Sequence, residues 1–498
     1  MTDDNLHSLL DRGFAAAGGR TAIRSPSGDA RLSYAELRRA TCRYANALVA
    51  LGVEPGDRVT VQVEKSIANV LLYLATLKTG AVYQPLNPAY TNTETDYFID
   101  DAEPKVIVCD PSRERDIKSL AGHHKIASVV TLDSKGDGSL ADIVRAMDGC
   151  HETVAREPNG LAGLLYTSGT TGRSKGAMIT HGNLISNART LVKLWGCRDG
   201  DVLLHALPIF HVHGLFVALN TAFLSGSEII WLDRFDAGEV IAALPQATIM
   251  MGVPTFYRRL LDSEDFTRET CRDMRLFISG SAPLPAETHR EFSVRTGHTI
   301  LERYGMTETG MIASNPLDGA RVAGTVGFAL PGVSLRIAGA QPGVIEVNGP
   351  NVFSGYWRSP EKTAEEFTAD GYFMTGDIGT MDADGRVSIV GRAKDVIISG
   401  GFNIYPKEIE DAIGAISGVA ESAVIGVPHP DFGEGVIAAV TAAGPLASEA
   451  EMIASLATHL ARFKVPKRIF VVDELPRNAM GKVQKAELRR RYGTAFSG

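Results

Sequence analysis

Residues 165–175 read LYTSGTTGRSK, and the apolar stretch LAGLLY, which begins at Leu161, leads directly into them. The apolar approach predicts a buried strand, and the residues after it combine hydroxyl groups, glycines and two cations. Glycines let a backbone come close to a ligand, successive N–H groups can point at an anion, and cations neutralise phosphate oxygens. The segment therefore predicts a polyphosphate-binding loop.

Two other interpretations of this loop are weaker. The Walker loop requires G-x-x-x-x-G-K-[ST], whereas Ser174 precedes Lys175 here and Thr and Ser outnumber Gly. A flexible Ser/Gly linker rarely follows a buried strand directly. We therefore expect a phosphate-binding loop of a different class.

The whole-chain composition bounds the class of protein. The chain has 498 residues, which is too long for one core and predicts two or more domains. Its net charge is 50 − 58 = −8 and it has no basic run, so we expect no nucleic-acid partner. Five cysteines at irregular spacing, an acidic N-terminus and the lack of a long apolar stretch favour a cytoplasmic protein without a membrane partner.

Strands alternate with amphipathic helices through most of the chain, which is typical of parallel sheets covered by helices. The clearest case is a strand at 57–63, a helix at 67–78 and a strand at 104–110. Shorter, Gly-punctuated strands predict a small β-rich subregion from Gly343. A strand–helix–strand pattern follows, so we place a boundary near Lys394. The further predicted strands are 201–207, 247–253, 274–280, 422–428 and 436–442, with a helix from about Pro406.

Four further segments combine residues that could carry chemistry. RYGMTETG (303–310) is predicted to form a loop, and YFMTGDIG (372–379) places Asp377 after a Thr-Gly turn. GRAKDVIISGGFNIYPKEIE (391–410) is basic and contains a Gly pair, and PRNAMGKVQK (476–485) ends near the C-terminus. Each alone is as well explained as a surface turn, an Asx turn or a solvated tail. Their occurrence together in this order favours a functional interpretation.

Together, TSGTTGRSKG, YGMTE, TGD, GRAKD with SGGFN, and PRNAMGK resemble the adenylate-forming superfamily of AMP-binding enzymes and acyl-CoA synthetases, over about residues 20 to 487. The resemblance implies an α/β fold. A large N-terminal domain (1–393) would contain two helix-covered sheets and a β-barrel-like subdomain, and a small mobile α+β lid (394–498) would follow. It also implies the chemistry: a carboxylate attacks the α-phosphate of ATP, and a thiol such as coenzyme A then displaces AMP. Mg²⁺ is the expected cofactor, with ATP and CoA as co-substrates.

The resemblance assigns roles to individual residues. Lys482 would bridge the attacking carboxylate and the α-phosphate, and its charge would offset the charge that grows in the transition state. Thr307 would serve the α-phosphate, Glu308 would bind Mg²⁺ and Thr171 would assist at the metal. The expected ATP- and AMP-binding residues are Thr167, Ser168, Gly169, Thr170, Thr171, Gly172, Lys175, Ser281, Ala282, Glu302, Arg303, Tyr304, Gly305, Met306, Thr307, Asp377, Arg392 and Lys482.

Within that set, Tyr304 would lie beside adenine, and Asp377 and Arg392 would hold the ribose hydroxyls. Lys394 occupies the hinge position of the family, where a lid would rotate between two half-reactions. Gly400 and Gly401 would present the lid face that the thiol uses. Phe402-Asn403 replaces the His-Arg pair of acetyl-CoA synthetases, so the CoA contacts of those enzymes are not carried over.

The acid-binding segments by family position are 205–216, 252–261 and 277–284. They carry more cationic and hydroxyl groups than a long-chain acyl pocket would, and this character suits a second carboxylate. Together with LERYGMTET and GGFNIYPKEIE, they resemble malonyl-CoA synthetases within the superfamily. The polar residues are His205, His211, His213, Arg258, Arg259, Ser279 and Ser281.

Malonate is therefore the expected acid, and methylmalonate is the second candidate. Arg303 is expected to bind the distal carboxylate, with Ser281, His211 and Arg258 as helpers; His211 is also a catalytic candidate. Arg258 and Arg259 are adjacent on a predicted helix, so at most one of them should face the pocket.

Other interpretations of this region remain. His205 could equally be a core histidine. On an extended segment, His211 and His213 would face the same side and could form a metal pair, but a third ligand is lacking nearby. The function alternatives are a ligase for another short acid, a ligase that charges a carrier-protein phosphopantetheine in trans, and a degenerate nucleotide-binding regulator. An exposed Lys482 would also be a target for a lysine acyltransferase and a deacylase, because acylation removes its charge.

Overall fold

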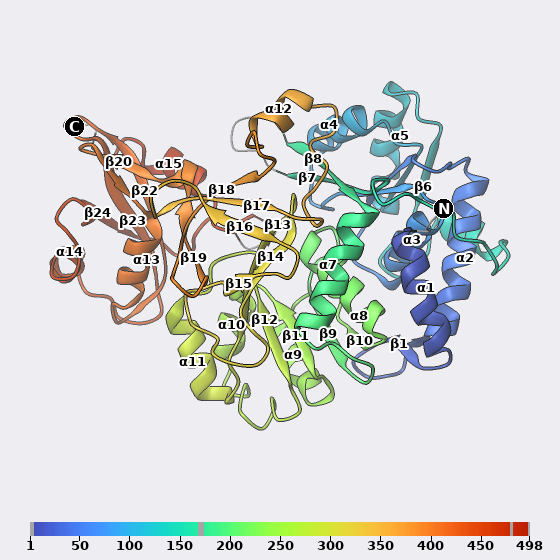
Figure 1. Ribbon diagram of the computed structural model, residues 1–498, viewed down its shortest axis with the longest axis horizontal. Helices are drawn as coiled ribbons and strands as arrows, with labels where there is room; N and C mark the ends of the chain where they lie inside the picture. Colours follow the sequence, from blue (N-terminus) through green and yellow to red (C-terminus); the bar gives the residue numbers. More distant parts are fainter. Residues whose placement is uncertain (1–3, 168–173, 479–481, 497–498) are drawn as a thin grey trace.

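The computed structural model describes residues 4–167, 174–478 and 482–496 (Figure 1). These residues form two large sheets with helices on their faces, a smaller antiparallel sheet and a C-terminal α+β unit. The expected fold class is confirmed. None of the helices in these ranges is long and apolar enough to cross a membrane.

The first large sheet carries the predicted phosphate-binding segment at its edge. Its strand order is β6-β5-β3-β4-β7-β8, and all neighbours are parallel except the terminal pair of β7 and β8. The predicted helix at 67–78 is α3 (Ile67–Lys78), which is buried almost all round and accordingly apolar on every face. The strands are β3 (Arg58–Gln62), β4 (Val82–Pro85), β5 (Val106–Cys109), β6 (Ser128–Thr131), β7 (Leu161–Thr167) and β8 (Lys175–Thr180).

The second large sheet has the order β15-β14-β13-β12-β11-β9-β10-β1-β2. Its centre is parallel and its two ends are antiparallel, so the carboxyl ends of the central strands share one edge. Its strands are β1 (Thr21–Arg24), β2 (Arg31–Ser33), β9 (Val202–His205), β10 (Glu228–Trp231), β11 (Ile249–Gly252), β12 (Leu276–Ser279), β13 (Leu301–Met306), β14 (Gly310–Ser314) and β15 (Phe328–Ala329).

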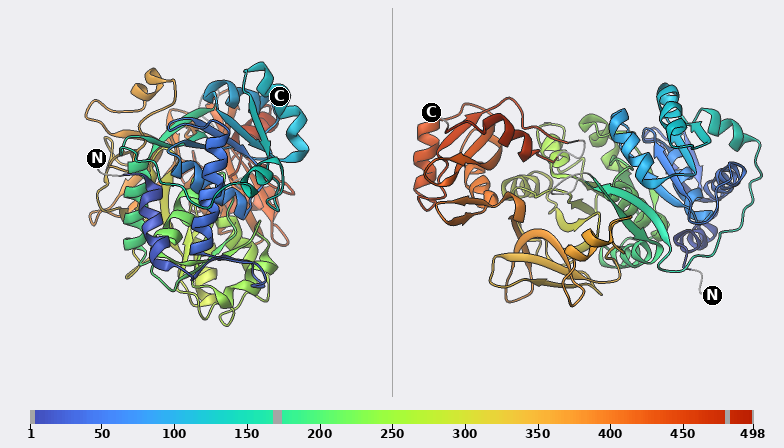
Figure 2. Two further views of the ribbon diagram at one scale, coloured as in Figure 1. Left: turned by 90° about the vertical axis from the view of Figure 1, so that its right-hand side faces the viewer. Right: turned by 90° about the horizontal axis from the view of Figure 1, so that it is seen from above.

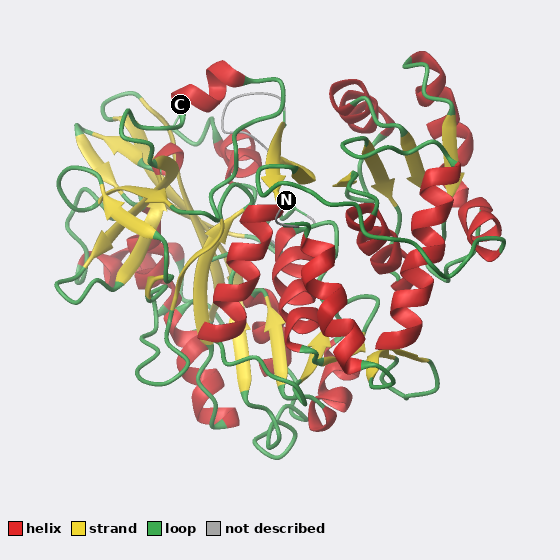
Figure 3. Ribbon diagram, turned by 45° about the vertical axis from the view of Figure 1, so that its right-hand side comes forward, coloured by secondary structure: helices red, strands yellow, loops and turns green. Residues whose placement is uncertain are grey.

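Helices cover these sheets in layers, as Figure 3 shows. One continuous apolar core joins the facing sides of both sheets with α1 (Leu6–Ala17), α2 (Tyr34–Ala50), α3 and α7 (His181–Leu194). Separate apolar clusters attach helices to the outer faces. These outer helices are α4 (Asn92–Ala102), α5 (Glu114–His123), α9 (Ala237–Ala243), α10 (Pro254–Leu261) and α11 (Ala286–Thr296); shorter helices are α6 (Ser139–Arg145) and α8 (Asn220–Ser225).

The predicted β-rich subregion is a four-stranded antiparallel sheet in the order β16-β17-β18-β19. It begins at β16 (Ser334–Ile337), earlier than the sequence indicated, and its core side chains join the main core. The remaining elements are β17 (Gly343–Asn348), the short helix α12 (Pro360–Glu365), β18 (Phe373–Met381) and β19 (Val387–Arg392).

The C-terminal unit has its own five-stranded sheet and its own apolar core, and it lies at one end of the molecule (Figure 2). A single turn of 3₁₀ helix, Ala393–Asp395, separates it from β19, and the domain boundary and hinge at Lys394 stay predictions. Its elements are β20 (Ile397–Ser399), β21 (Phe402–Ile404), α13 (Pro406–Gly414), β22 (Val419–His429), β23 (Gly433–Ala442), α14 (Glu449–Ala457), β24 (Arg468–Val471) and α15 (Lys485–Tyr492).

Three local expectations were wrong. Arg303–Met306 is not a loop but the end of β13, which pairs with β12 and turns back into β14. Asp377 lies inside β18 rather than at the end of a strand. His211-x-His213 is not extended, because a π-helical segment begins at His213. At Arg303–Met306 and at Asp377, Gly and Thr suggested a turn, and pairing with distant strands overrode that local preference.

Candidate active site

The elements that carry the motif residues meet where the two large sheets, the antiparallel sheet and the C-terminal unit converge. Thr167 is the last residue of β7 and Lys175 is the first of β8, so they frame the phosphate-binding segment. They are register partners across this hairpin. The expected phosphate ligands Ser168, Gly169, Thr170, Thr171 and Gly172 lie outside the described residues.

Tyr304, Asp377 and Arg392 form one buried chain of contacts. The Tyr304 hydroxyl donates to Asp377 Oδ2, and Arg392 Nε lies 2.7 Å from Asp377 Oδ1 in an ion pair. Asp377 and Arg392 are direct partners across β18 and β19, so the sheet register itself sets this pair. Burial, followed by the Asp377 charge, raises the pKa of the Tyr304 phenol far above its usual range. The three predicted nucleoside ligands therefore lie together.

Glu308 lies in the turn after β13 and faces the phosphate-binding hairpin. Its Oε1 accepts from Thr167 Oγ1 at 3.1 Å and from the Tyr356 hydroxyl at 3.2 Å. Burial raises the pKa of Glu308. Mg²⁺ is usually held by one or two carboxylates and by substrate phosphates, and a buried carboxylate beside a hydroxyl fits that donor set.

Two residues of this region were not predicted. Lys175 Nζ donates to Glu366 Oε1 at 2.7 Å and lies 4.6 Å from the centre of the Tyr356 ring. The Tyr356 hydroxyl is also 2.7 Å from Glu366 Oε2. None of the sequence motifs contains either residue, and only the packing of the segment around Tyr356 beside β8, with α12 directly after it, brings them to Lys175.

Arg303, which directly precedes Tyr304 in β13, is buried, and its guanidinium is incompletely hydrogen-bonded. Its Nε and Nη2 have no hydrogen-bond partner among the described residues. Burial lowers the pKa of Arg303 to about 9, and Tyr257 and Glu302 only partly oppose this effect. A guanidinium in this state is a strong site for an anion that enters from outside.

Ser281 and His213 lie beside this arginine. His213 Nδ1 is 3.2 Å from Ser281 Oγ, and Ser281 has a left-handed backbone with φ of 72°. Burial, then the Arg303 charge, lowers the pKa of His213 well below its usual value. His213, which was named among the polar residues of the acid-binding segments but not as a helper of Arg303, is thus the histidine in contact with Ser281. Ala282 follows Ser281 and is half-buried.

The Lys482 charge acts on His211 across the site. Burial and the Lys482 charge lower the pKa of His211 to about 3, so its imidazole is neutral at pH 7. Solvent reaches the Lys482 side chain, yet the surrounding protein and Arg392 lower its pKa, while Asp377 and Glu308 act in the opposite direction. The Lys482 backbone N–H donates to Asn478 Oδ1 at 3.0 Å. The C-terminal unit therefore presents Lys482 to the nucleotide residues.

Arg258 does not lie in the acid pocket, contrary to the expectation. Its guanidinium pairs with Asp262 at 2.6 Å and with Glu291 at 2.9 Å. The reason is the amphipathic pattern of α10, whose buried face carries Tyr257 and Leu260 while Arg258 points outward. Arg259 is exposed.

The remaining predicted residues take other positions. His205 is a core histidine, with Nε2 3.0 Å from Gly214 O and its ring stacked on Trp231. Gly305 must be glycine, since a Cβ there would lie 2.1 Å from Gly310 O. The other placements are Met306 at the end of β13, Thr307 in the turn after it, Glu302 buried within β13, Lys394 exposed in the 3₁₀ turn, and Gly400 and Gly401 in left-handed conformations between β20 and β21.

Two family models match this chain. The model of the AMP-binding enzyme matches residues 10–357, and the model of the AMP-binding enzyme C-terminal domain matches residues 408–482. The boundary near Lys394 falls between these two matches. The match to the first model covers more than half of the chain.

Individual relatives extend the comparison. ATP-bound MatB from Rhodopseudomonas palustris is 53% identical, covers 99% of this chain and 100% of its own, and superposes with a TM-score of 0.96; apo MatB gives 0.85. A feruloyl-CoA synthase of Amycolatopsis sp is 37% identical over 99% of this chain and 100% of its own. A mitochondrial malonate–CoA ligase of Mus musculus is 34% identical over 95% of this chain and 88% of its own.

Proposed function

This chain belongs to the AMP-binding enzyme family and is an acid–thiol ligase, and we propose that it joins malonate to coenzyme A through a malonyl-adenylate. ATP would be consumed to AMP and pyrophosphate. The observation that carries the choice of acid is Arg303, a buried guanidinium beside Ser281 and His213 whose Nε and Nη2 find no hydrogen-bond partner in the described part of the chain.

The physical argument starts from the cost of a buried charge. Burial of a cation without a partner costs several kcal/mol. Removal of one member of a buried ion pair destabilises a protein by on the order of 3–5 kcal/mol, because the other charge is left unpaired. An acid with a single carboxylate uses that group for adenylation and leaves Arg303 unpaired. A second carboxylate supplies the missing anion and can bind the guanidinium with two parallel hydrogen bonds. The site therefore favours a short dicarboxylic acid.

The contacts described above support the nucleotide roles that the family resemblance implies. Asp377 and Arg392 would hold the ribose hydroxyls, Tyr304 would lie beside adenine, and Glu308 with Thr167 would bind Mg²⁺ together with the phosphates. Mg²⁺, when bound, would neutralise phosphate charge. Lys482 would lie between the carboxylate of the acid and the α-phosphate, where two anions must approach one another.

The second half-reaction, in which the thiol displaces AMP, requires other residues around the active site than adenylation does. An acyl-adenylate hydrolyses readily, so the thiol must arrive while water is excluded. We propose that the C-terminal unit rotates about Lys394, withdraws Lys482 and brings Gly400 and Gly401 towards the site. The higher TM-score with ATP-bound MatB than with apo MatB supports the view that the described pose belongs to adenylation.

The relatives support an acid–CoA ligase but differ in their acids. A feruloyl-CoA synthase and malonate–CoA ligases match at similar identity, so overall similarity does not select the acid. Arg303 would select an acid with a second carboxylate. Methylmalonate has the same second carboxylate as malonate and is therefore the alternative substrate. A carrier-protein thiol in place of free coenzyme A is the other alternative.

A pyrophosphate-release assay tests the proposal. We expect malonate to give the highest kcat/KM in a panel with methylmalonate, succinate, butyrate and ferulate, with free CoA as the acceptor. Arg303→Leu should lower malonate turnover about 30- to 1000-fold, the equivalent of ~2–4 kcal/mol, and should spare butyrate. A uniform loss across all acids would show that Arg303 is not the carboxylate ligand. Higher turnover with an acyl-carrier protein would favour that alternative.

A further inference from the structure

The phosphate-loop lysine is already bound to an anion of the protein itself. Lys175 Nζ lies 2.7 Å from Glu366 Oε1, and both side chains are largely shielded, with 16% and 29% of their surfaces exposed. Among the described residues, this is the ion pair that the structure gives Lys175. In the nucleotide complex the same ammonium would bind the β- and γ-phosphates. The Glu366 carboxylate therefore takes the contact with Lys175 that a phosphate would make.

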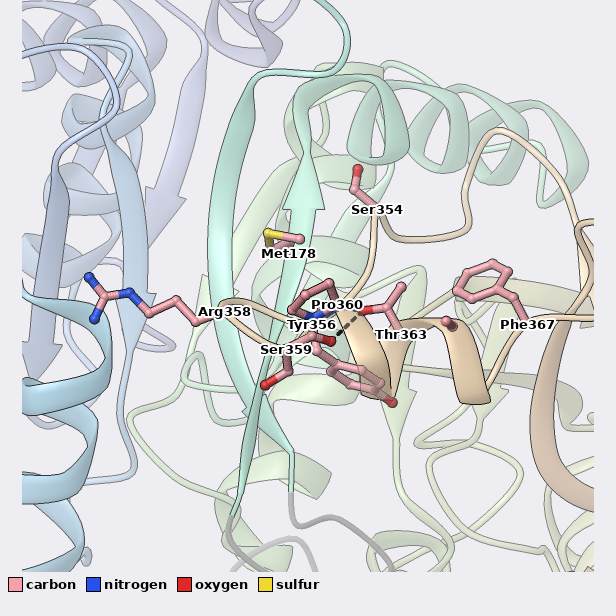
Figure 4. Close-up of a pocket in the computed structure, with 9 residues that line it drawn as sticks. Met178, Ser354, Tyr356, Arg358, Ser359, Pro360, Thr363 and Phe367 are labelled. Atoms are coloured by element: carbon pink, nitrogen blue, oxygen red, sulfur yellow. Dashed lines mark hydrogen bonds between the residues drawn. The ribbon is translucent and has the colours of Figure 1, made fainter.

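The carboxylate is held in this place by its neighbours. Glu366 directly follows α12, and its backbone O accepts from Met374 N at 2.9 Å. The Tyr356 N–H donates to Thr363 Oγ1 at 2.9 Å, which ties α12 to the segment that carries the Tyr356 ring (Figure 4). The Tyr356 hydroxyl then contacts Glu366 Oε2 at 2.7 Å. Backbone and side-chain contacts thus both direct Glu366 at Lys175.

A hollow lies beside α12 and the segment that carries Tyr356. A cavity of about 490 Å³ lies there, and Figure 4 shows Tyr356, Thr363 and Phe367 among the residues around it. Residues on both sides of Glu366 in the sequence line this cavity. The segment that carries Glu366 therefore borders open space, although the Glu366 side chain is directed at Lys175 and does not line the cavity.

The charges of this cluster favour competition between Glu366 and a phosphate for Lys175, rather than simultaneous binding of both. One ammonium, Lys175, stands beside two carboxylates, Glu366 and Glu308, which are linked through the Tyr356 hydroxyl. Mg²⁺ would travel with the phosphates and meet Glu308. The Glu366 carboxylate then has lost its cation and repels the phosphate that displaced it.

We propose that Glu366 competes with pyrophosphate for Lys175 and thereby promotes release of this product after adenylation. This inference rests on the ATP half of the proposed function and is independent of the acid. ATP retains the Tyr304, Asp377 and Arg392 contacts while it displaces Glu366. Pyrophosphate, once cut from AMP, has only the phosphate contacts and is readily displaced by Glu366, a positioning residue that acts through Lys175.

Glu366→Gln tests the inference because it keeps the shape and removes the charge. We expect magnesium pyrophosphate to bind about three- to tenfold more tightly, measured by calorimetry without acid and as product inhibition against ATP. The KM for ATP should fall and kcat should fall with it, because product release slows. A merely structural lesion would weaken both ligands instead.

Two further variants complete the design. Glu365→Gln is the matched control, since Glu365 is exposed, pairs with Lys362 and does not contact Lys175; its pyrophosphate affinity should equal that of the wild type. Tyr356→Phe keeps the ring beside Lys175 and removes the hydroxyl that directs Glu366, so a smaller gain of affinity is expected. Unchanged or weaker pyrophosphate binding in Glu366→Gln would overturn the inference, as would a wild type that binds no pyrophosphate. Neither result depends on whether malonate is the substrate.

Discussion

A Cβ atom on Gly280 would lie 2.4 Å from Arg303 Cζ, so the guanidinium fills the space that a side chain at this position would take. Gly280 directly follows β12, and Arg303 lies in the neighbouring parallel strand β13. The glycine is therefore part of the acid pocket although it contributes no functional group. Its φ is not left-handed, so the requirement is for space rather than for backbone freedom.

Gly280→Ala should displace Arg303 and impair malonate use. We expect kcat/KM for malonate to fall about 10- to 100-fold, the equivalent of ~1.4–2.7 kcal/mol, while ATP binding stays near the wild-type value. Parallel kinetics with malonate and butyrate measure the effect. Gly19→Ala is the control, because a Cβ there meets no atom within 4 Å. Full malonate activity in Gly280→Ala would mean that Arg303 is free to move.

Arg303→Leu should stabilise the ligand-free protein while it removes malonate binding. The wild-type protein buries a guanidinium with two unsatisfied nitrogens among the described residues, and an apolar replacement removes that cost. We expect a gain in unfolding free energy on the order of 1–3 kcal/mol. Denaturant unfolding checks this gain, and malonate should raise the Tm of the wild type but not of the variant. A less stable variant would indicate a structural role for the charge.

Glu302 should make stability depend on pH. Burial raises its pKa from 4.5 to about 7; Lys407 and Arg303 lower it and Asp411 raises it. The folded state thus binds the proton more tightly than the unfolded state. The stability from this group is fully present below pH 4.5 and is lost as the pH rises to about 7.

Glu302→Gln removes this dependence, because the amide does not titrate and keeps an oxygen to accept from Leu284 N. At pH 8 the variant should be more stable than the wild type by on the order of 1–3 kcal/mol, and the difference should shrink at pH 4.5. Urea denaturation at the two pH values measures it. A constant difference at both pH values would show that Glu302 is ionised in the folded protein throughout.

Lys482→Ala should separate the two half-reactions. Without the ammonium between the carboxylate and the α-phosphate, pyrophosphate release should fall at least 100-fold, the equivalent of ~2.7 kcal/mol or more. Thioester formation from supplied malonyl-adenylate and CoA should be retained in large part. Equal losses in both assays would remove Lys482 from its assigned role.

Lys482 should also be sensitive to acylation. It is exposed, and its lowered pKa leaves more of the amine unprotonated and nucleophilic than an ordinary lysine. A lysine acyltransferase that acts here would abolish adenylation, and a deacylase would restore it. Incubation with acetic anhydride, with and without bound ATP, followed by mass spectrometry should show modification of Lys482 and protection by ATP. An unmodified Lys482 under conditions that label Lys362 would contradict this expectation.

The sequence alone determined the class of fold and predicted a set of nucleotide-site residues. Strand and helix periodicities placed α3 and the parallel strands closely, because they depend on local spacing and on burial of one face. Tyr304, Asp377 and Arg392 were predicted by motif and do lie together. Their role in binding remains a prediction.

Tertiary structure decided the rest, since the decisive contacts join segments far apart in the chain. Spacing could not reveal that Lys175 meets Glu366, 191 residues later, or that Gly280 makes room for Arg303. It also could not tell that Arg258 turns outward to Asp262 and Glu291. Local sequence thus specified which chemical groups are present. Packing of distant strands and helices determined which charged groups pair within the protein, as Arg258 does, and which remain available to bind a substrate, as Arg303 does.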